Sequence, residues 1–232
     1  WRRHTDSDKR GWLDGYVRHV PGAVEVGALM LTVITAATDR SLLTVEELRA
    51  AAGVTGSSRD ADLVALGEEV ADSICQACGV VAAGVDPPSL REETVRQTER
   101  DMWSARKIRL DRRPIVSIEM IAVDGAVLGD DDYEVDQATG WLYRLQSDAR
   151  TDWCAAKVVI EYVAGWYTVP RDLKVAASKL VTALWSESTR DPNLKRERSE
   201  FGELEYWVPP TTDPLLSAEI QDLLRPYREY SV

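Results

Sequence analysis

Apolar residues recur at three- and four-residue spacings in several stretches of this chain, and each such stretch predicts a helix with one face toward a core. The first helix begins at a capping box, in which the Thr44 hydroxyl bonds the amide of Glu47 and the Glu47 carboxylate reaches back. Asp60 is predicted to cap a longer second helix that ends at Gly79. The core-facing positions of this second helix are Leu63, Leu66, Val70, Ile74 and Ala77.

Two more helices are predicted in the last third of the chain. Val169-Pro170 starts the first of them, because proline fits a first helical turn, where its missing amide costs nothing. Its apolar stripe consists of Leu173, Ala177, Leu180 and Leu184. Asp213-Pro214 is predicted to cap the last helix, whose apolar face consists of Leu216, Ile220, Leu223, Leu224 and Tyr227.

Between about residue 93 and residue 165 the apolar period shortens toward two, which is typical of strands. Val116, Ile118 and Met120 alternate with Ser117 and Glu119, which predicts a strand. Asp124-Gly125 is a strong hairpin signal, and Thr139-Gly140 predicts a second turn. A last strand is expected over residues 158–163. This middle third therefore predicts a small antiparallel β module.

The segment after the third helix differs in character from the rest. Residues 190–200 carry both signs of charge and a proline, which predicts a solvated connector. Residues 203–208 then form a candidate strand with no sequence neighbour to pair with, so we expect it to add to a sheet of another subunit or partner. The predicted partner-binding residues are those of this strand and of the last helix face: Leu204, Tyr206, Trp207, Val208, Ile220, Leu223, Leu224 and Tyr227.

Residues 1–29 show no clean period, and the chain opens with Trp1. Regular patterning of apolar residues begins at Met30, so we expect Met30 to be the biological start and residues 1–29 to be upstream sequence. A genuine N-terminal arm is the alternative. The apolar run over residues 20–34 is interrupted by proline, glycine and glutamate, which predicts neither a membrane span nor a signal peptide.

Together these elements predict an α+β fold with a helical-bundle core, an inserted small antiparallel β module and a C-terminal strand-plus-helix arm. The expected divisions are an N-terminal segment (1–29), the first part of the helical core (30–88), the β module (89–166), the long helix (167–190) and the docking arm (191–232). Pro87-Pro88 marks the boundary between the first part of the helical core and the β module.

Composition narrows the function classes. The 232 residues are 44% hydrophobic and 29% charged, as in ordinary globular proteins of one or two domains. The net charge of -11 is the wrong sign for a protein that binds DNA by neutralising phosphates. Three cysteines indicate a reducing compartment rather than a disulfide framework. Only His4 and His19 are available, which disfavours histidine metal sites and serine-hydrolase triads.

Cys75 and Cys78 have the spacing of a redox or zinc motif. They fall in the last turn of the second helix, where the helix dipole opposes a thiolate, so we interpret them as small buried side chains. Cys154 has no cysteine partner at ligand spacing. The acidic run Asp130-Asp131-Asp132 lacks the ligand ladder of a calcium loop and predicts a solvated turn.

Two further features concern surfaces. A basic run close to Trp103 leaves a nucleic-acid patch open as an alternative; its members are Arg106, Lys107, Arg109, Arg112 and Arg113. Eight tryptophans stand against a single phenylalanine, Phe201, and tryptophan suits surfaces that are apolar on one side and wet on the other. The acidic balance of the chain disfavours the nucleic-acid patch, and core packing is the alternative for Trp141, Trp153, Trp166 and Trp185.

The order of motifs along the chain resembles the head-to-tail connector proteins of tailed phages, the adaptor or head-completion proteins beneath the portal. The resemblance covers residues 30–228. It is carried by SLLTVEEL (41–48), RLDRRPIVSI (109–118), VIEYVAGW (159–166), VPRDLK (169–174), RSEFGELEY (198–206) and IQDLLRPYR (220–228).

The resemblance implies a structural virion protein that is made in the host cytoplasm and located in the neck, without catalysis, cofactor or metal. Its copies are expected to form a homo-oligomeric ring, a dodecamer, that joins the portal to a tail-side neck or tail-terminator protein. DNA would pass through the channel without specific binding, since carboxylates repel phosphate. The alternatives are a small enzyme using carboxylates of the β module, or a redox or zinc protein using Cys75 and Cys78.

Overall fold

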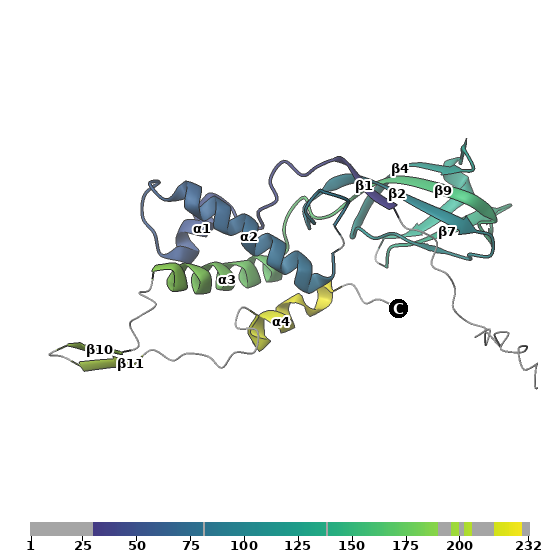
Figure 1. The fold of residues 1–232 in the computed structure, drawn as a ribbon. Helices are drawn as coiled ribbons and strands as arrows, with labels where there is room; N and C mark the ends of the chain where they lie inside the picture. Colours follow the sequence, from purple (N-terminus) through teal and green to yellow (C-terminus); the bar gives the residue numbers. More distant parts are fainter. Residues whose placement is uncertain are drawn as a thin grey trace, which may run out of the picture.

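The fold was examined in a computed structural model, which describes residues 30–80, 82–137, 139–189, 196–199, 202–205 and 216–228. Figure 1 shows two halves side by side, with the helices in one half and the large β-sheets in the other. The chain crosses between the halves more than once, because β1 (Met30–Thr35) lies in the β half and α1 (Val45–Ala52) in the helical half.

The helical half contains α1, α2 (Asp60–Cys78), α3 (Arg171–Thr189) and α4 (Ala218–Leu224), and α4 continues into the short 3-10 helix η2 (Arg225–Tyr227). The predicted capping box is confirmed at the start of α1. Thr44 Oγ1 accepts a hydrogen bond from the Glu47 amide at 3.3 Å, and Glu47 Oε2 accepts one from the Thr44 amide at 2.8 Å. Gly53 and Gly79 end α1 and α2 in the left-handed conformation.

The predicted cap of α2 is wrong in detail. Asp60 is the first helical residue rather than the cap, and the cap residue, Arg59, makes no side-chain capping bond. The Asp60 carboxylate instead binds the guanidinium of Arg49 in α1 through two bonds, of 2.7 and 2.5 Å. A cross-helix ion pair therefore replaces the expected local cap and fixes α1 against α2.

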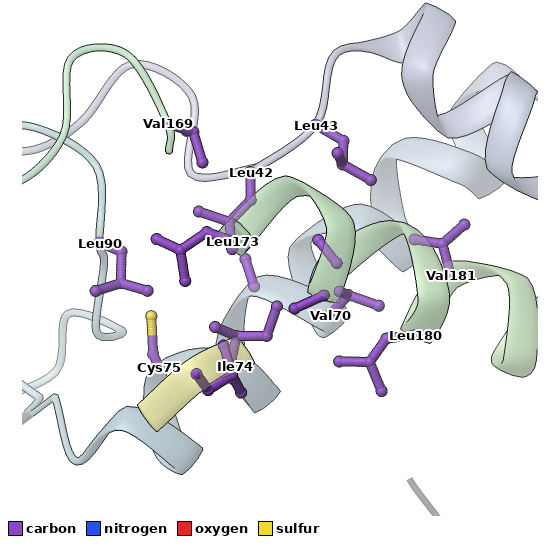
Figure 2. Close-up of a cluster of buried hydrophobic side chains, with 14 of the residues drawn as sticks. Leu42, Leu43, Val70, Ile74, Cys75, Leu90, Val169, Leu173, Leu180 and Val181 are labelled. Atoms are coloured by element: carbon purple, nitrogen blue, oxygen red, sulfur yellow. The ribbon is translucent and has the colours of Figure 1, made fainter. Parts of the chain in front are cut away.

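Apolar side chains from all four helices form one core, part of which Figure 2 shows. The predicted stripe of α3 is confirmed, because Leu173, Ala177 and Leu180 are buried and Leu184 is partly buried against them. Leu63, Val70 and Ile74 of α2 face the same core. No helix among the described residues is long and apolar enough to cross a membrane.

A five-stranded antiparallel sheet forms one layer of the β half, in the order β1-β2-β9-β4-β5. Its further strands are β2 (Glu93–Met102), β4 (Ile115–Val123), β5 (Ala126–Val127) and β9 (Ala155–Ala164). The last predicted strand is therefore longer than expected, and β9 occupies the centre of the sheet. Gly165 follows β9 with a φ of +109°, and a Cβ there would collide with the carbonyl of Arg91.

The second sheet consists of β3 (Ile108–Arg109), β6 (Tyr133–Asp136), β7 (Trp141–Gln146) and β8 (Ala149–Thr151). Its order is β3-β7-β6, with β8 also paired to β7, and the 3-10 helix η1 (Asp130–Asp132) precedes β6. Buried side chains of both sheets belong to one core, among them Val95, Ile121, Leu142, Trp153 and Ile160. The two sheets therefore pack on each other.

The predicted hairpin at Asp124-Gly125 is confirmed, with φ values of +49° and +89° at the two turn residues between β4 and β5. The predicted strand with Val116, Ile118 and Met120 is confirmed as part of β4, but its apolar residues do not alternate regularly between the two faces. Val116 is 46% exposed, whereas Ile115 and Ile121 are buried. Two register irregularities against β9, between Ile115 and Ser117 and between Ile118 and Met120, shift the strand's alternation.

The structure also corrects the predicted connector and lone strand. Residues of the expected connector form β10 (Arg196–Ser199), which pairs antiparallel with β11 (Gly202–Glu205) in a separate hairpin. The register sets Arg196 opposite Glu205 and Arg198 opposite Glu203.

The expected helical-bundle core is contradicted. Among the described residues, four helices stand beside two antiparallel sheets with nine strands, and helices and strands hold similar numbers of residues. The range 30–88, expected to be helical core, begins with a strand of the five-stranded sheet. A sequence pattern indicates which segments are strands but not how they pair, and the pairing of β1 with the distant β2 has no local signal.

Candidate functional site

The residues predicted to bind partners fall in two separate places. Leu204 lies on β11, opposite Glu197 of β10. Tyr206, Trp207 and Val208 lie outside the described residues. The other four predicted residues belong to α4 and η2, in the helical half. The structure therefore does not bring the strand and the helix face together into one surface.

The predicted face of α4 packs on its own chain. Ile220 is 4% exposed and Leu224 is fully buried, both within the core formed with α2 and α3, and Leu223 is partly buried against it. Tyr227 meets Trp166 edge to face, with ring centroids 6.2 Å apart. Lys179 of α3 pairs with Glu219 of α4 at 2.9 Å. This helix face anchors the end of the chain to the helices.

The hairpin β10–β11 has the opposite character. Its contacts are mainly those between its own two strands, and Figure 1 shows it standing away from the helices and from the two large sheets. An isolated two-stranded hairpin is marginally stable in water, so this hairpin gains little stability from its own two strands.

The motif over residues 109–114 passes through the interior of the β half. Arg112 is 2% exposed, and its Nε donates to Glu93 Oε1 at 2.7 Å. The Arg112 amide donates to the Tyr162 hydroxyl, which donates to Gln97 Oε1, at 3.1 and 3.0 Å. Gln97 in turn donates to the carbonyl of Arg109 at 2.7 Å. These buried bonds tie the segment between β3 and β4 to β2 and β9.

The fold separates the five cations of the basic run, which on the sequence alone could form a nucleic-acid patch. Arg112 forms a buried ion pair with Glu93, and the Lys107 ammonium lies 3.6 Å from the centroid of the Trp141 ring. Arg113 lies beside Gly140. The five cations predicted as one patch therefore do not share one surface.

Among the described residues, the buried carboxylates of the β half do not line a cleft. Burial raises the pKa of Glu93, Glu99 and Asp111. Glu93 is paired with the buried Arg112, and Glu99 and Asp111 are partly buried. Glu99 accepts a bond from Gln97 at 2.7 Å. A cavity of about 240 Å³ between the two halves is lined by residues such as Arg113, Trp166 and Arg228, with no carboxylate.

Cys75 and Cys78 are buried at the end of α2, each 1% exposed. Burial raises the pKa of the Cys75 thiol to about 12, which opposes the thiolate that redox chemistry or zinc binding needs. In the part of the chain that the structure describes, no group of three or more His, Cys, Asp or Glu side chains is placed to hold a metal ion. These observations favour a packing role for both cysteines.

The sequence model of the Head completion protein family matches residues 41–230, most of the chain. The chain belongs to the Head completion protein family. The match begins at Ser41, just before α1, and spans both halves of the fold and the C-terminal helix. The predicted family membership is confirmed. The predicted role is confirmed with it: the chain is a structural head-to-tail connector protein of the virion neck.

Solved structures share the fold. One is the neck of an empty gene transfer agent particle computed with C6 symmetry, at 19% identity and a TM-score of 0.55, covering 88% of this chain and 97% of that chain. Others are the native neck computed with C12 symmetry, at 17% and 0.53, and the native virion, at 18% and 0.54, both with the same coverage. No curated protein matches the chain.

Proposed function

We propose that copies of this chain form an oligomeric ring, a dodecamer, which joins the portal to a tail-side neck or tail-terminator protein and lets DNA pass through its channel. Family membership supports the connector role, and the similar structures come from particle necks computed with C6 and C12 symmetry. The chain carries out no catalysis in this role. The net charge of -11 suits a channel through which DNA passes without binding, because carboxylates repel phosphates.

The projecting hairpin β10–β11 is the observation that carries the docking part of this proposal. It lies outside the body of the chain, and the residues that follow it include the apolar positions Tyr206, Trp207 and Val208. We assign partner contact to Leu204 and these three residues. The face with Ile220, Leu223, Leu224 and Tyr227 then holds the end of the arm on its own subunit.

The test replaces residues 196–208 by a Gly-Ser segment of equal length and leaves α4 in place. A replacement is better than deleting the chain from residue 203 onward, because such a deletion would also remove the buried Leu224 and so destabilise the helical core. We expect normal helix and strand signals by circular dichroism and a chain that is no longer incorporated into portal-bearing heads.

The matched control exchanges one cross-strand pair, Arg196→Glu with Glu205→Arg, which keeps opposite charges in register and should keep incorporation. Wild-type incorporation of the Gly-Ser variant would show that the hairpin does not dock. Absence of the wild-type chain from the necks of assembled particles would contradict the connector function itself.

A further inference from the structure

A basic groove of about 480 Å³ lies on the outer face of the second sheet, between the segment before β3 and strand β8. Arg106, Lys107 and Arg150 line it, together with Tyr143 and Asp152. The outward direction follows from β7, where Leu142 is buried in the core and its neighbour Tyr143 points to the other face.

Two of the three cations in the basic groove are held in place by aromatic rings. Lys107 Nζ lies 3.6 Å from the centroid of the Trp141 ring, and the Arg150 guanidinium carbon lies 3.8 Å from that of Tyr143. The Arg106 side chain is 91% exposed, and its Nε is 3.8 Å from an Asp152 carboxylate oxygen. Cations fixed in this way lose little side-chain entropy when a partner binds them.

An acidic edge lies on the other side of the same sheet. In the order β3-β7-β6, strand β3 and strand β6 flank β7 on opposite sides. The exposed Asp130 and Asp131 of η1 and Glu134 of β6 line a hollow of about 730 Å³ there, with Asp148 from the turn before β8. Arg150 of the basic groove reaches the same hollow and pairs with Glu134 at 2.8 Å. Arg106 and Lys107 therefore lie at one edge of the sheet and Asp130 and Asp131 at the other, with the Arg150–Glu134 ion pair between the two patches.

We propose that the basic groove of one copy receives the acidic edge of a second copy. This inference rests on the proposed ring, in which every subunit uses one surface toward one neighbour and a different surface toward the other. Two complementary patches at opposite edges of one sheet meet that requirement, and charge complementarity also fixes the register of the contact.

The observations favour a second copy over a nucleic acid as the occupant. The faces of the Trp141 and Tyr143 rings are already covered by cations, so bases cannot stack on those faces. Asp152 lines the groove, and Glu134 pairs with Arg150 at 2.8 Å, which places carboxylates beside any approaching phosphate. The chain itself supplies acidic surface in excess.

The experiment is a charge-reversal cycle in the full chain. One variant carries Arg106→Glu and Lys107→Glu, a second carries Asp130→Lys and Asp131→Lys, and a third combines all four substitutions. The matched control reverses Glu68 and Glu69, which are exposed on α2, far from both patches in the fold. Circular dichroism and thermal unfolding verify folding of every variant.

Two readouts are taken: the mass of the purified chain in low and high salt, and the amount of chain in the necks of assembled particles. We expect each single-patch reversal to lower assembly by about tenfold or more, because like charges then face each other, and the combined variant to restore it. The Glu68 and Glu69 control should assemble as the wild type does.

Failure of the combined variant to restore assembly, or normal assembly of both single-patch variants, would overturn the proposal while leaving the connector function intact. Normal assembly together with weaker binding of a duplex oligonucleotide by the Arg106 and Lys107 variant would assign the groove to nucleic acid instead. Absence of the wild-type chain from the neck would count against the proposed function rather than against this contact alone.

Discussion

The guanidinium of Arg112 and the carboxylate of Glu93 form an ion pair inside the β half, with each side chain only 3% exposed and an Nε–Oε1 distance of 2.7 Å. Glu93 is the first residue of β2, and Arg112 belongs to the segment between β3 and β4. The pair therefore joins one end of the five-stranded sheet to the chain that connects it with the second sheet.

Replacing Arg112 by Met should destabilise the protein by about 3–5 kcal/mol at neutral pH, because it leaves a buried carboxylate without its counter-charge. Burial already raises the pKa of Glu93, and Arg112 counteracts this rise. In the variant the folded-state pKa rises further, so protonation stabilises the folded state more than the unfolded state. The loss of stability should therefore shrink as pH falls through the folded pKa toward about 4.3, the unfolded value.

Urea unfolding at several pH values measures this effect. Arg225→Met is the matched control, because Arg225 pairs with Asp222 at the surface and its loss should cost at most about 1 kcal/mol. Equal losses for the two variants, or a loss for Arg112→Met that does not change with pH, would contradict the role given to the buried pair.

Thiol labelling should distinguish Cys154 from Cys75 and Cys78. Cys154 is exposed, whereas the pKa of about 12 and the burial of Cys75 keep its thiol protonated and out of reach. We expect a thiol reagent at mild alkaline pH to modify Cys154 quickly in the native protein, and Cys75 and Cys78 only upon unfolding. Mass spectrometry of the labelled peptides gives the order of modification. Fast labelling of Cys75, or zinc near one per chain by elemental analysis, would reinstate the metal or redox alternative.

Leu224→Ala should lower the free energy of unfolding of the isolated chain by about 2–5 kcal/mol, because a fully buried side chain leaves a cavity in the helical core. Leu223→Ala, at a partly buried position of the same helix, should cost clearly less. Denaturant unfolding of the dilute monomer measures both. An unchanged stability of Leu224→Ala would mean that α4 packs on a partner rather than on its own subunit.

A chain that begins at Met30 should fold and assemble normally, as the sequence predicts for residues 1–29. A chain that begins at residue 36 also lacks β1 and should be less stable, because Leu31 leaves the core and β2 becomes an edge strand. Thermal unfolding compares the two truncations. Loss of assembly in the chain that begins at Met30 would show that residues 1–29 take part in contacts between subunits.

Signals confined to a few neighbouring residues predicted local structure well. Thr44 with Glu47, and Asp124 with Gly125, define a cap and a turn by chemistry that acts within four residues, and both are present. The stripe of α3 was visible because a long helix repeats its pattern many times.

Features that depend on distant residues were missed. Asp60 looks like a cap until Arg49 of another helix is known to bind it, and the irregular register of β4 depends on its pairing with β9. Burial of Arg112 has no signal in its own neighbourhood, since its partner Glu93 is far away in sequence. For the candidate site, the sequence indicated the arm but not that Leu224 holds its end on the chain's own core, because an amphipathic stripe does not say which surface covers it.

The central position of β9 has a consequence for how the chain is built during synthesis. Before residues 155–164 have been made, the sheet exists only as two separate pairs, β1 with β2 and β4 with β5, and each pair alone is marginal. The helical core also waits for α3, which follows directly after β9. Both halves therefore close late and almost together, so most of the nascent chain should remain unfolded until its last third emerges, with apolar strand edges exposed to aggregation in the meantime.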